Sequence, residues 1–312
     1  MICGLLSNRR LSQAIAMSMM AVLFLGLKTS KADEPKTGAR AKKVSKQTVI
    51  RISKETTRIT EPLDNEGYVD YVQALNDRYS KDVTPQNNYE VVVRSVMPPT
   101  EISEPIRQEY FSRLGIPVPD EQARFYQDFI TFTVDGKKDQ MLTDGVIKEH
   151  DVIVSQPWTA ADHPRAAKWV RKFGDDLDKL VEGSKRAKFY TPYIAGEVSE
   201  AEPYPRVISL LLPSAQQQRD IARGLSIRAM GRIGAGDLDG AWNDLQAMHR
   251  VARHVGQGFS LIENLVGIAI NAMAFQGEIQ ILKSPKLTVP QIKRFLANSQ
   301  AQKPLPPMAD NI

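Results

Sequence analysis

Apolar residues recur every three or four positions along most of the second half of the chain, which is the period of one face of an α-helix. The clearest segments are 164–184, 216–233, 238–255 and 260–282. Because the connections between the last three segments are only a few residues long, we expect neighbouring helices to pack antiparallel. In the segment 260–282 we expect one stripe of side chains to face the core. It consists of Ile262, Leu265, Ala269, Ala272, Gln276 and Ile279.

The first half of the chain is also mainly helical in pattern, although its stripes are shorter. Helices are expected over 67–79, over 84–97 with Thr84-Pro85 as the start, and over 104–114 with Gly115 as the end. The segment 125–134 permits either a strand or a helix, and 152–154 is expected to form a short strand.

Helix-start signals mark several of these segments. Ser260 with Glu263, and Thr288 with Gln291, have the spacing of a capping box, in which each side chain binds the other residue's backbone amide. Asp237 stands in part of a calcium-loop pattern, but the first and twelfth ligand positions lack carboxylates. We therefore expect Asp237 to cap a helix.

The pattern as a whole predicts a mainly α fold of antiparallel helical hairpins, either a regular repeat or an irregular helical array, after a signal segment and a disordered linker. The predicted parts are a signal peptide or membrane anchor at 1–32, a basic disordered linker at 33–60, an N-terminal mostly helical module at 61–157, a helical-hairpin module at 158–303 and a Pro-rich tail at 304–312.

The N-terminal segment has the three parts of a secretory signal. Arg9 and Arg10 form the basic part, residues 11–27 are uncharged and mostly apolar, and Ser30 and Ala32 stand where a signal peptidase needs small side chains. We expect cleavage after Ala32 and export to the periplasm or the extracellular space. The alternative is that residues 11–27 remain as an anchor in the cytoplasmic membrane, the chain's only expected membrane contact.

Composition and charge narrow the function classes. Cys3 is the only cysteine, so a chain cleaved after Ala32 has neither disulfides nor a thiol nucleophile. The net charge of +5 comes from the N-terminal part, because residues 59–312 contain 29 basic and 33 acidic residues. A mildly acidic body argues against a nucleic-acid partner.

Two resemblances extend this pattern. The segment 225–252, with small Ala229 and Ala241 on either side of the Gly236-Asp237 turn, resembles one tetratricopeptide unit. A second resemblance is carried by residues 63–71, 74–76, 83–88, 236–242, 255–258 and 261–263. Over roughly 60–300 the chain resembles a family of uncharacterised exported proteins from planctomycete bacteria. This family resemblance implies export and a helical fold, and it carries no known activity or catalytic residues.

Four carboxylates lie close together in sequence, at Glu61, Asp64, Glu66 and Asp70. Paired carboxylates perform acid–base chemistry when their environments separate their pKa values. Acids also favour the positive end of a helix, and we expect Asp64 and Glu66 to serve there.

The four histidines are His150, His163, His249 and His254, and no two have the i, i+4 spacing of a helical zinc site. We therefore predict no metal site. His249 and His254 are expected to form, with Arg250 and Arg253, a cationic helix end that complements the helix dipole.

Polar and aromatic residues inside the apolar segments allow two interpretations. Asn264 and Asn271 would either line a ligand groove or make interhelical hydrogen bonds, and the second is favoured. Trp158 and Trp169 are expected in the core, and Trp242 is expected in the core against Ala229.

No catalytic, cofactor-binding or metal-binding residue is predicted. We expect an exported, non-enzymatic helical protein that binds a protein or peptide partner in the cell envelope. The alternative is an exported hydrolase that uses carboxylates such as Asp64, Glu66 and Asp70.

Cleavage after Ala32 predicts that the protein recovered from the cell envelope begins at Asp33. N-terminal sequencing measures this directly. Recovery of a chain that retains its first 32 residues would contradict cleavage and favour the anchor.

Overall fold

The computed structural model describes residues 51–65, 67–134, 140–195 and 213–307. The predicted signal segment, most of the predicted linker and residues 308–312 lie outside these ranges. Within them the chain is mainly helical, which confirms the predicted fold class, and no strand occurs there apart from two isolated bridges, Leu63 with Val69 and Asn88 with Lys188. The tetratricopeptide-like hairpin arrangement stays a prediction.

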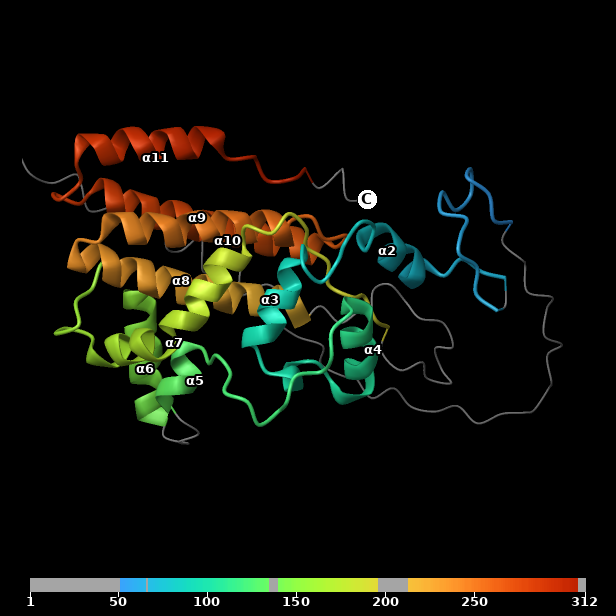
Figure 1. Ribbon diagram of the computed structural model, residues 1–312, viewed down its shortest axis with the longest axis horizontal. Coiled ribbons are helices and arrows are strands. Elements are labelled where there is room, and N and C mark those ends of the chain that lie inside the picture. Colours follow the sequence, from blue (N-terminus) through green and yellow to red (C-terminus); the bar gives the residue numbers. More distant parts are fainter. Residues whose placement is uncertain (1–50, 66, 135–139, 196–212, 308–312) are drawn as a thin grey trace, which may run out of the picture. The chain divides into compact units, whose positions relative to one another are not determined.

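The helices differ in length, with the longest ones in the second half of the chain (Figure 1). In chain order they are α2 (Tyr71–Tyr79), α3 (Tyr89–Val96), the 3₁₀ turn η1 (Pro99–Glu101), α4 (Glu104–Leu114), α5 (Phe129–Val134), α6 (Gln140–Ile153), α7 (Pro164–Gly183), α8 (Pro213–Ala235), α9 (Leu238–Val255), α10 (Leu261–Leu282) and α11 (Val289–Ala301).

Most expected helices of the second half agree with the structure, and their ends follow local chemistry. The Asp237 side chain accepts a hydrogen bond from the Gly240 amide at 2.9 Å, so it caps α9 as predicted. At α10 the Glu263 amide donates to Ser260 Oγ and the Ser260 amide donates to Glu263 Oε2, both at 3.1 Å. This reciprocal pair is the predicted capping box. Gly115, with φ of 69°, ends α4 in the left-handed conformation that glycine adopts without strain.

Several boundaries in the first half were predicted wrongly. Helix α3 begins at Tyr89 rather than at Thr84, because the Asn88 side chain accepts the Glu90 amide and caps it. Thr84 instead closes a turn, in which its hydroxyl accepts the Asn87 amide at 3.3 Å. Helix α2 begins at Tyr71 rather than at residue 67.

The two ambiguous apolar segments are helical. Residues 152–153 end α6, so the predicted strand at 152–154 is wrong, and 125–134 contains α5. The β-branched residues that suggested strands are accommodated because both helices pack against the core, and tertiary packing overrides local preference.

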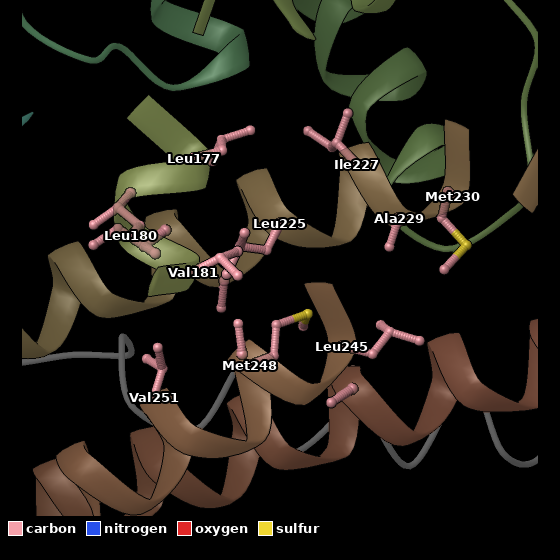
Figure 2. Packing of buried hydrophobic residues seen from close by; sticks show 14 of the residues in the cluster. Leu177, Leu180, Val181, Leu225, Ile227, Ala229, Met230, Leu245, Met248 and Val251 are labelled. Atoms are coloured by element: carbon pink, nitrogen blue, oxygen red, sulfur yellow. The ribbon is translucent and has the colours of Figure 1, made fainter. Parts of the chain in front are cut away.

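The core lies where α7 meets α8 and α9. Figure 2 shows Leu180 and Val181 of α7 in the same cluster as Leu225 of α8 and Met248 and Val251 of α9, and all five side chains are buried. At the other end of α7, the rings of Trp169 and Phe173 contact Tyr126 edge-on at centroid distances of 5.9 and 5.5 Å. Trp169 is fully buried, as predicted.

Helices α8, α9 and α10 pack on one another, and α10 approaches α9 closely at two glycines. A Cβ atom added at Gly277 would lie 2.4 Å from Leu245 Cδ2, and one at Gly267 would lie 2.7 Å from the Ala252 carbonyl oxygen. These distances are too short for a side chain, so glycine at these two positions lets the helices touch.

A fully buried ion pair, absent from the sequence-based expectations, joins α3 to its neighbours. Arg94 Nε lies 2.8 Å from Glu90 Oε1, and neither side chain is exposed. The Tyr110 hydroxyl of α4 donates to the same Glu90 oxygen at 2.7 Å, and Arg94 also donates to Gln217 of α8. Burial raises the pKa of Glu90, and the Arg94 charge opposes that rise.

Breaking this pair on one side would leave an unpaired charge in the core. We expect Arg94→Met to lower the free energy of unfolding by about 3–5 kcal/mol, and Glu90→Gln combined with Arg94→Met to recover much of the loss. Urea unfolding measures both. Lys185→Met, at an exposed pair with Glu182, is the matched control and should change stability by less than about 1 kcal/mol. Equal stability of Arg94→Met and the unaltered protein would show that the pair contributes nothing.

Candidate functional site

The apolar stripe of α10 that was predicted to face the core faces outward instead. All six of its residues (Ile262, Leu265, Ala269, Ala272, Gln276 and Ile279) are exposed. The side that packs inward carries Glu263, Gly267, Ile270, Ala274, Gly277 and Ile281, all buried. Helix α10 is apolar on most sides, so periodicity alone fits either face, and the small residues decide which face reaches α9.

The exposed face of α10 forms a continuous line of apolar side chains, which we call the outer stripe. It consists of Leu261, Leu265, Ile268, Ala272, Phe275, Ile279 and Leu282. The six large members are between 40% and 67% exposed. A contiguous exposed apolar surface of this kind marks an interaction site more often than isolated apolar residues do.

The spacing along the outer stripe alternates between four and three residues over the length of α10. This is the 3.5-residue period with which two helices keep their apolar seams in contact. The stripe also lacks charge, since the acidic residues of α10 are Glu263, which is buried in the capping box, and Glu278, which lies against His249 at 3.1 Å. The geometry is that of a helix prepared for a second helix.

Helix α11 carries a second, shorter set of exposed apolar residues, Val289, Ile292 and Leu296. It lies beside α9 (Figure 1), where the Phe295 ring stacks on Trp242 at a centroid distance of 4.3 Å and an interplanar angle of 10°. Trp242 is therefore buried as predicted, but its stacking partner comes from α11, whereas Ala229 had been expected to pack against the ring.

Within the described ranges, α10 is also the one helix whose length and composition would allow it to cross a bilayer. Its inner side is tied into the fold by polar contacts. The His249 ring of α9 makes hydrogen bonds with Asn271 at 2.6 Å and with Glu278 at 3.1 Å, and the Tyr193 hydroxyl donates to Glu263 at 3.2 Å. Insertion into a bilayer would break these contacts and expose the polar groups to lipid.

Both histidines of α9 lie inside the fold rather than at an exposed helix end, which corrects the predicted position. His249 is buried between α9 and α10, where its bond to Asn271 makes that asparagine an interhelical partner, as favoured from the sequence. His254 is buried as well, with Nε2 donating to the Ser184 carbonyl at 3.0 Å and its ring stacked on Tyr89 at 5.3 Å. Burial lowers the pKa of His254 to about 4, which favours the neutral form at neutral pH.

Asn264 and the remaining histidines also have structural partners. The Asn264 side-chain amide donates to the carbonyl of Gly256, the C-cap of α9, at 3.4 Å. His163 lies 3.1 Å from Glu149, and the His150 ring stacks against Phe129. In the described part of the chain, no group of three or more His, Cys, Asp or Glu side chains is placed to hold a metal ion.

The carboxylates near the start of the folded region support the backbone. Asp70 accepts the Gln73 amide at 2.9 Å and caps α2. Asp64 accepts the Tyr68 amide at 2.9 Å, so it closes a turn rather than standing at the helix N-terminus where it was expected. Glu66 lies outside the described residues. Both placed aspartates therefore hold local backbone.

A pocket of about 470 Å³ opens between α7 and α8 beside Trp158. Trp158 is buried as predicted, with its indole nitrogen donating to the Ile227 carbonyl at 2.9 Å. The buried cation of the pocket, Arg228, is bidentate to Asp244 at 2.7 and 3.1 Å and also binds Asp178 at 2.7 Å. Its donors therefore point at the protein's own carboxylates rather than at a ligand.

The buried His254 predicts a specific loss of stability in acid. A histidine whose pKa falls from about 6.5 in the unfolded chain to about 4 in the fold contributes stability above pH 6.5 that disappears as the pH falls toward 4. This loss amounts to about 3 kcal/mol. His254→Gln removes the titrating group, so the stability advantage of the unaltered protein over the variant should shrink by that amount between pH 7 and pH 4 in urea unfolding. Parallel pH profiles would contradict the assignment.

No protein-family model, no curated protein and no solved structure matches the chain. The resemblance to the exported planctomycete family therefore stays a prediction. Among the described residues, the outer stripe of α10 is exposed and makes no contact that explains its apolar character.

Proposed function

We propose that this is an exported, non-enzymatic helical protein that binds a helix of a protein partner along the outer stripe of α10. The observation that carries the proposal is the combination of exposure and spacing on that stripe. Six large apolar side chains stand in water at a coiled-coil period, while the opposite side of the same helix is fixed to α9.

The energetics fit a reversible complex. Full burial of a Leu, Ile or Phe side chain is worth about 1.5–3 kcal/mol, so completing the burial of a half-exposed one contributes roughly 1 kcal/mol. Six such side chains contribute about 6 kcal/mol in total, which exceeds the lower estimates of the cost of association by only a small margin. The outer stripe alone therefore supports recognition of modest affinity.

A helix suits the outer stripe better than an extended peptide does. An added strand needs an open sheet edge with free backbone groups, and the described residues contain no sheet. An amphipathic helix instead recognises anchors that recur every three or four residues, which is the pattern that α10 presents.

Export is supported by the sequence of residues 1–32, which lie outside the described part of the chain. The hydrolase alternative receives no support from the placed carboxylates, because Asp64 and Asp70 each accept a backbone amide. The proposed partner is accordingly another protein, encountered in the cell envelope or outside the cell.

Site-specific photo-crosslinking in the producing cell tests the proposal. A benzoylphenylalanine residue replacing Phe275, which is 49% exposed at the middle of the outer stripe, should yield a covalent protein adduct identifiable by mass spectrometry. The same probe replacing Lys179, an exposed residue of α7, is the control and should yield little adduct. Adducts with lipid only, or equal protein adducts from both positions, would refute the proposal.

A further inference from the structure

We infer that the helix bound on the outer stripe is α10 of a second copy of this chain, running antiparallel. The inference rests on the proposed function, because it names the partner of the same surface. Its basis is that the outer stripe is complementary to itself when its direction is reversed.

The reversed stripe pairs residues of matching or complementary size. The apolar stripe of such a helix consists of two alternating heptad positions, a and d. In an antiparallel pair of helices, each residue at one of these positions faces a residue at the other position of the partner helix. One such alignment sets Leu265 opposite Leu282, Ile268 opposite Ile279, and Ala272 opposite Phe275, while Leu261 extends past the end of the partner helix. Each pair occurs twice about the two-fold axis, and in the two central pairs the smallest residue of the stripe faces the largest one.

A parallel pair of the same helices fits less well. In that arrangement each residue meets its own copy, which sets two Phe275 rings against each other and leaves two Ala272 methyl groups facing across a gap. Since packed interfaces avoid both overfilled and empty layers, the antiparallel pairing is favoured.

Charge presents no obstacle to self-association. Glu278 flanks the stripe, and in the antiparallel alignment the nearest residue on the same flank of the second copy is the uncharged Asn271. Two copies of Glu278 therefore do not meet across the two-fold axis. Like charges that meet in this way commonly exclude self-pairing.

The size of the contact sets the expected strength. Helix α10 has 22 residues, which gives a length of about 33 Å and a diameter of about 10 Å. The resulting footprint of roughly 300 Å² per copy is below the ~800 Å² per partner of a standard interface. The dimer is therefore reversible and dependent on concentration.

Cysteine pairing between two differently substituted chains tests the alignment. The background is the full chain with Cys3→Ser, purified as the producing cell processes it, which has no other cysteine. One sample carries Leu265→Cys and the other carries Leu282→Cys. On mixing under oxidising conditions we expect a disulfide between the two variants and little within either alone, because equivalent residues at position 265 lie about 25 Å apart in the antiparallel pair.

A charge exchange tests the same pairing without cysteine. Ile268→Glu and Ile279→Lys, each alone, should weaken the dimer at least tenfold in sedimentation equilibrium, since each sets a charge against an apolar residue. Both changes together should restore the dimer, because the new carboxylate faces the new ammonium group of the other copy. Both positions are exposed, at 49% and 40%, and circular dichroism should show an unchanged fold.

The outcomes separate this inference from the proposed function. Disulfides within each single variant, or a chain that stays monomeric at high concentration, would overturn the antiparallel dimer. A monomer that still gives a photo-adduct with a different protein at position 275 would overturn the dimer alone. A monomer that gives no protein adduct and sediments with phospholipid vesicles would overturn both, and would assign the stripe to a membrane surface.

Discussion

The contact between α9 and α10 through glycine determines much of what this protein presents to its surroundings. Gly267 and Gly277 leave no room for a Cβ atom against Ala252 and Leu245, so the backbones of the two helices approach as closely as their atoms permit. The two glycines thereby lie on the inner side of α10, together with Ala274, Ile270 and Ile281, while its leucines, its other isoleucines and Phe275 are exposed. This choice of inner side is what leaves the outer stripe exposed.

Polar contacts inside the fold fix the orientation of several helices. The Glu90–Arg94 pair fixes α3 against α4 and α8, and Arg228 joins α7, α8 and α9 through Asp178 and Asp244. Buried charges of this kind are costly unless every partner is present, so they favour one arrangement of helices over others. In this protein they specify how the helices sit, while the apolar α10 surface is free to meet another molecule.

Sequence patterns predicted the helices of the second half well, because each carries strong local signals. The bounds of α9, the Asp237 cap and the capping box at Ser260 follow from residues adjacent in the chain, and the structure confirms them.

The orientation of α10 could not be predicted in this way. Its hydrophobicity is spread around the helix, and the decisive fact, the lack of space beside Leu245, belongs to a different helix. The same reason hid the roles of His249 and His254, whose partners lie far away in sequence. The ion pair of Arg94 with Glu90 is local, but Tyr110 and Gln217, which bind this pair, come from other helices. The composition of α10 does contain one signal, because the helix has more apolar residues than a single buried face requires.

The attachment of α11 has a consequence for how the molecule opens. This helix is held mainly by the stacking of Phe295 on Trp242 and by bonds from Gln291 and Arg294 to Asp239, an exposed carboxylate. An element joined through so few contacts separates at a lower free energy than the core does. When α11 departs, the Trp242 indole meets solvent while Trp158 and Trp169 stay enclosed. The tryptophan emission of this protein therefore contains a built-in signal for partial opening, distinct in wavelength from that of complete unfolding.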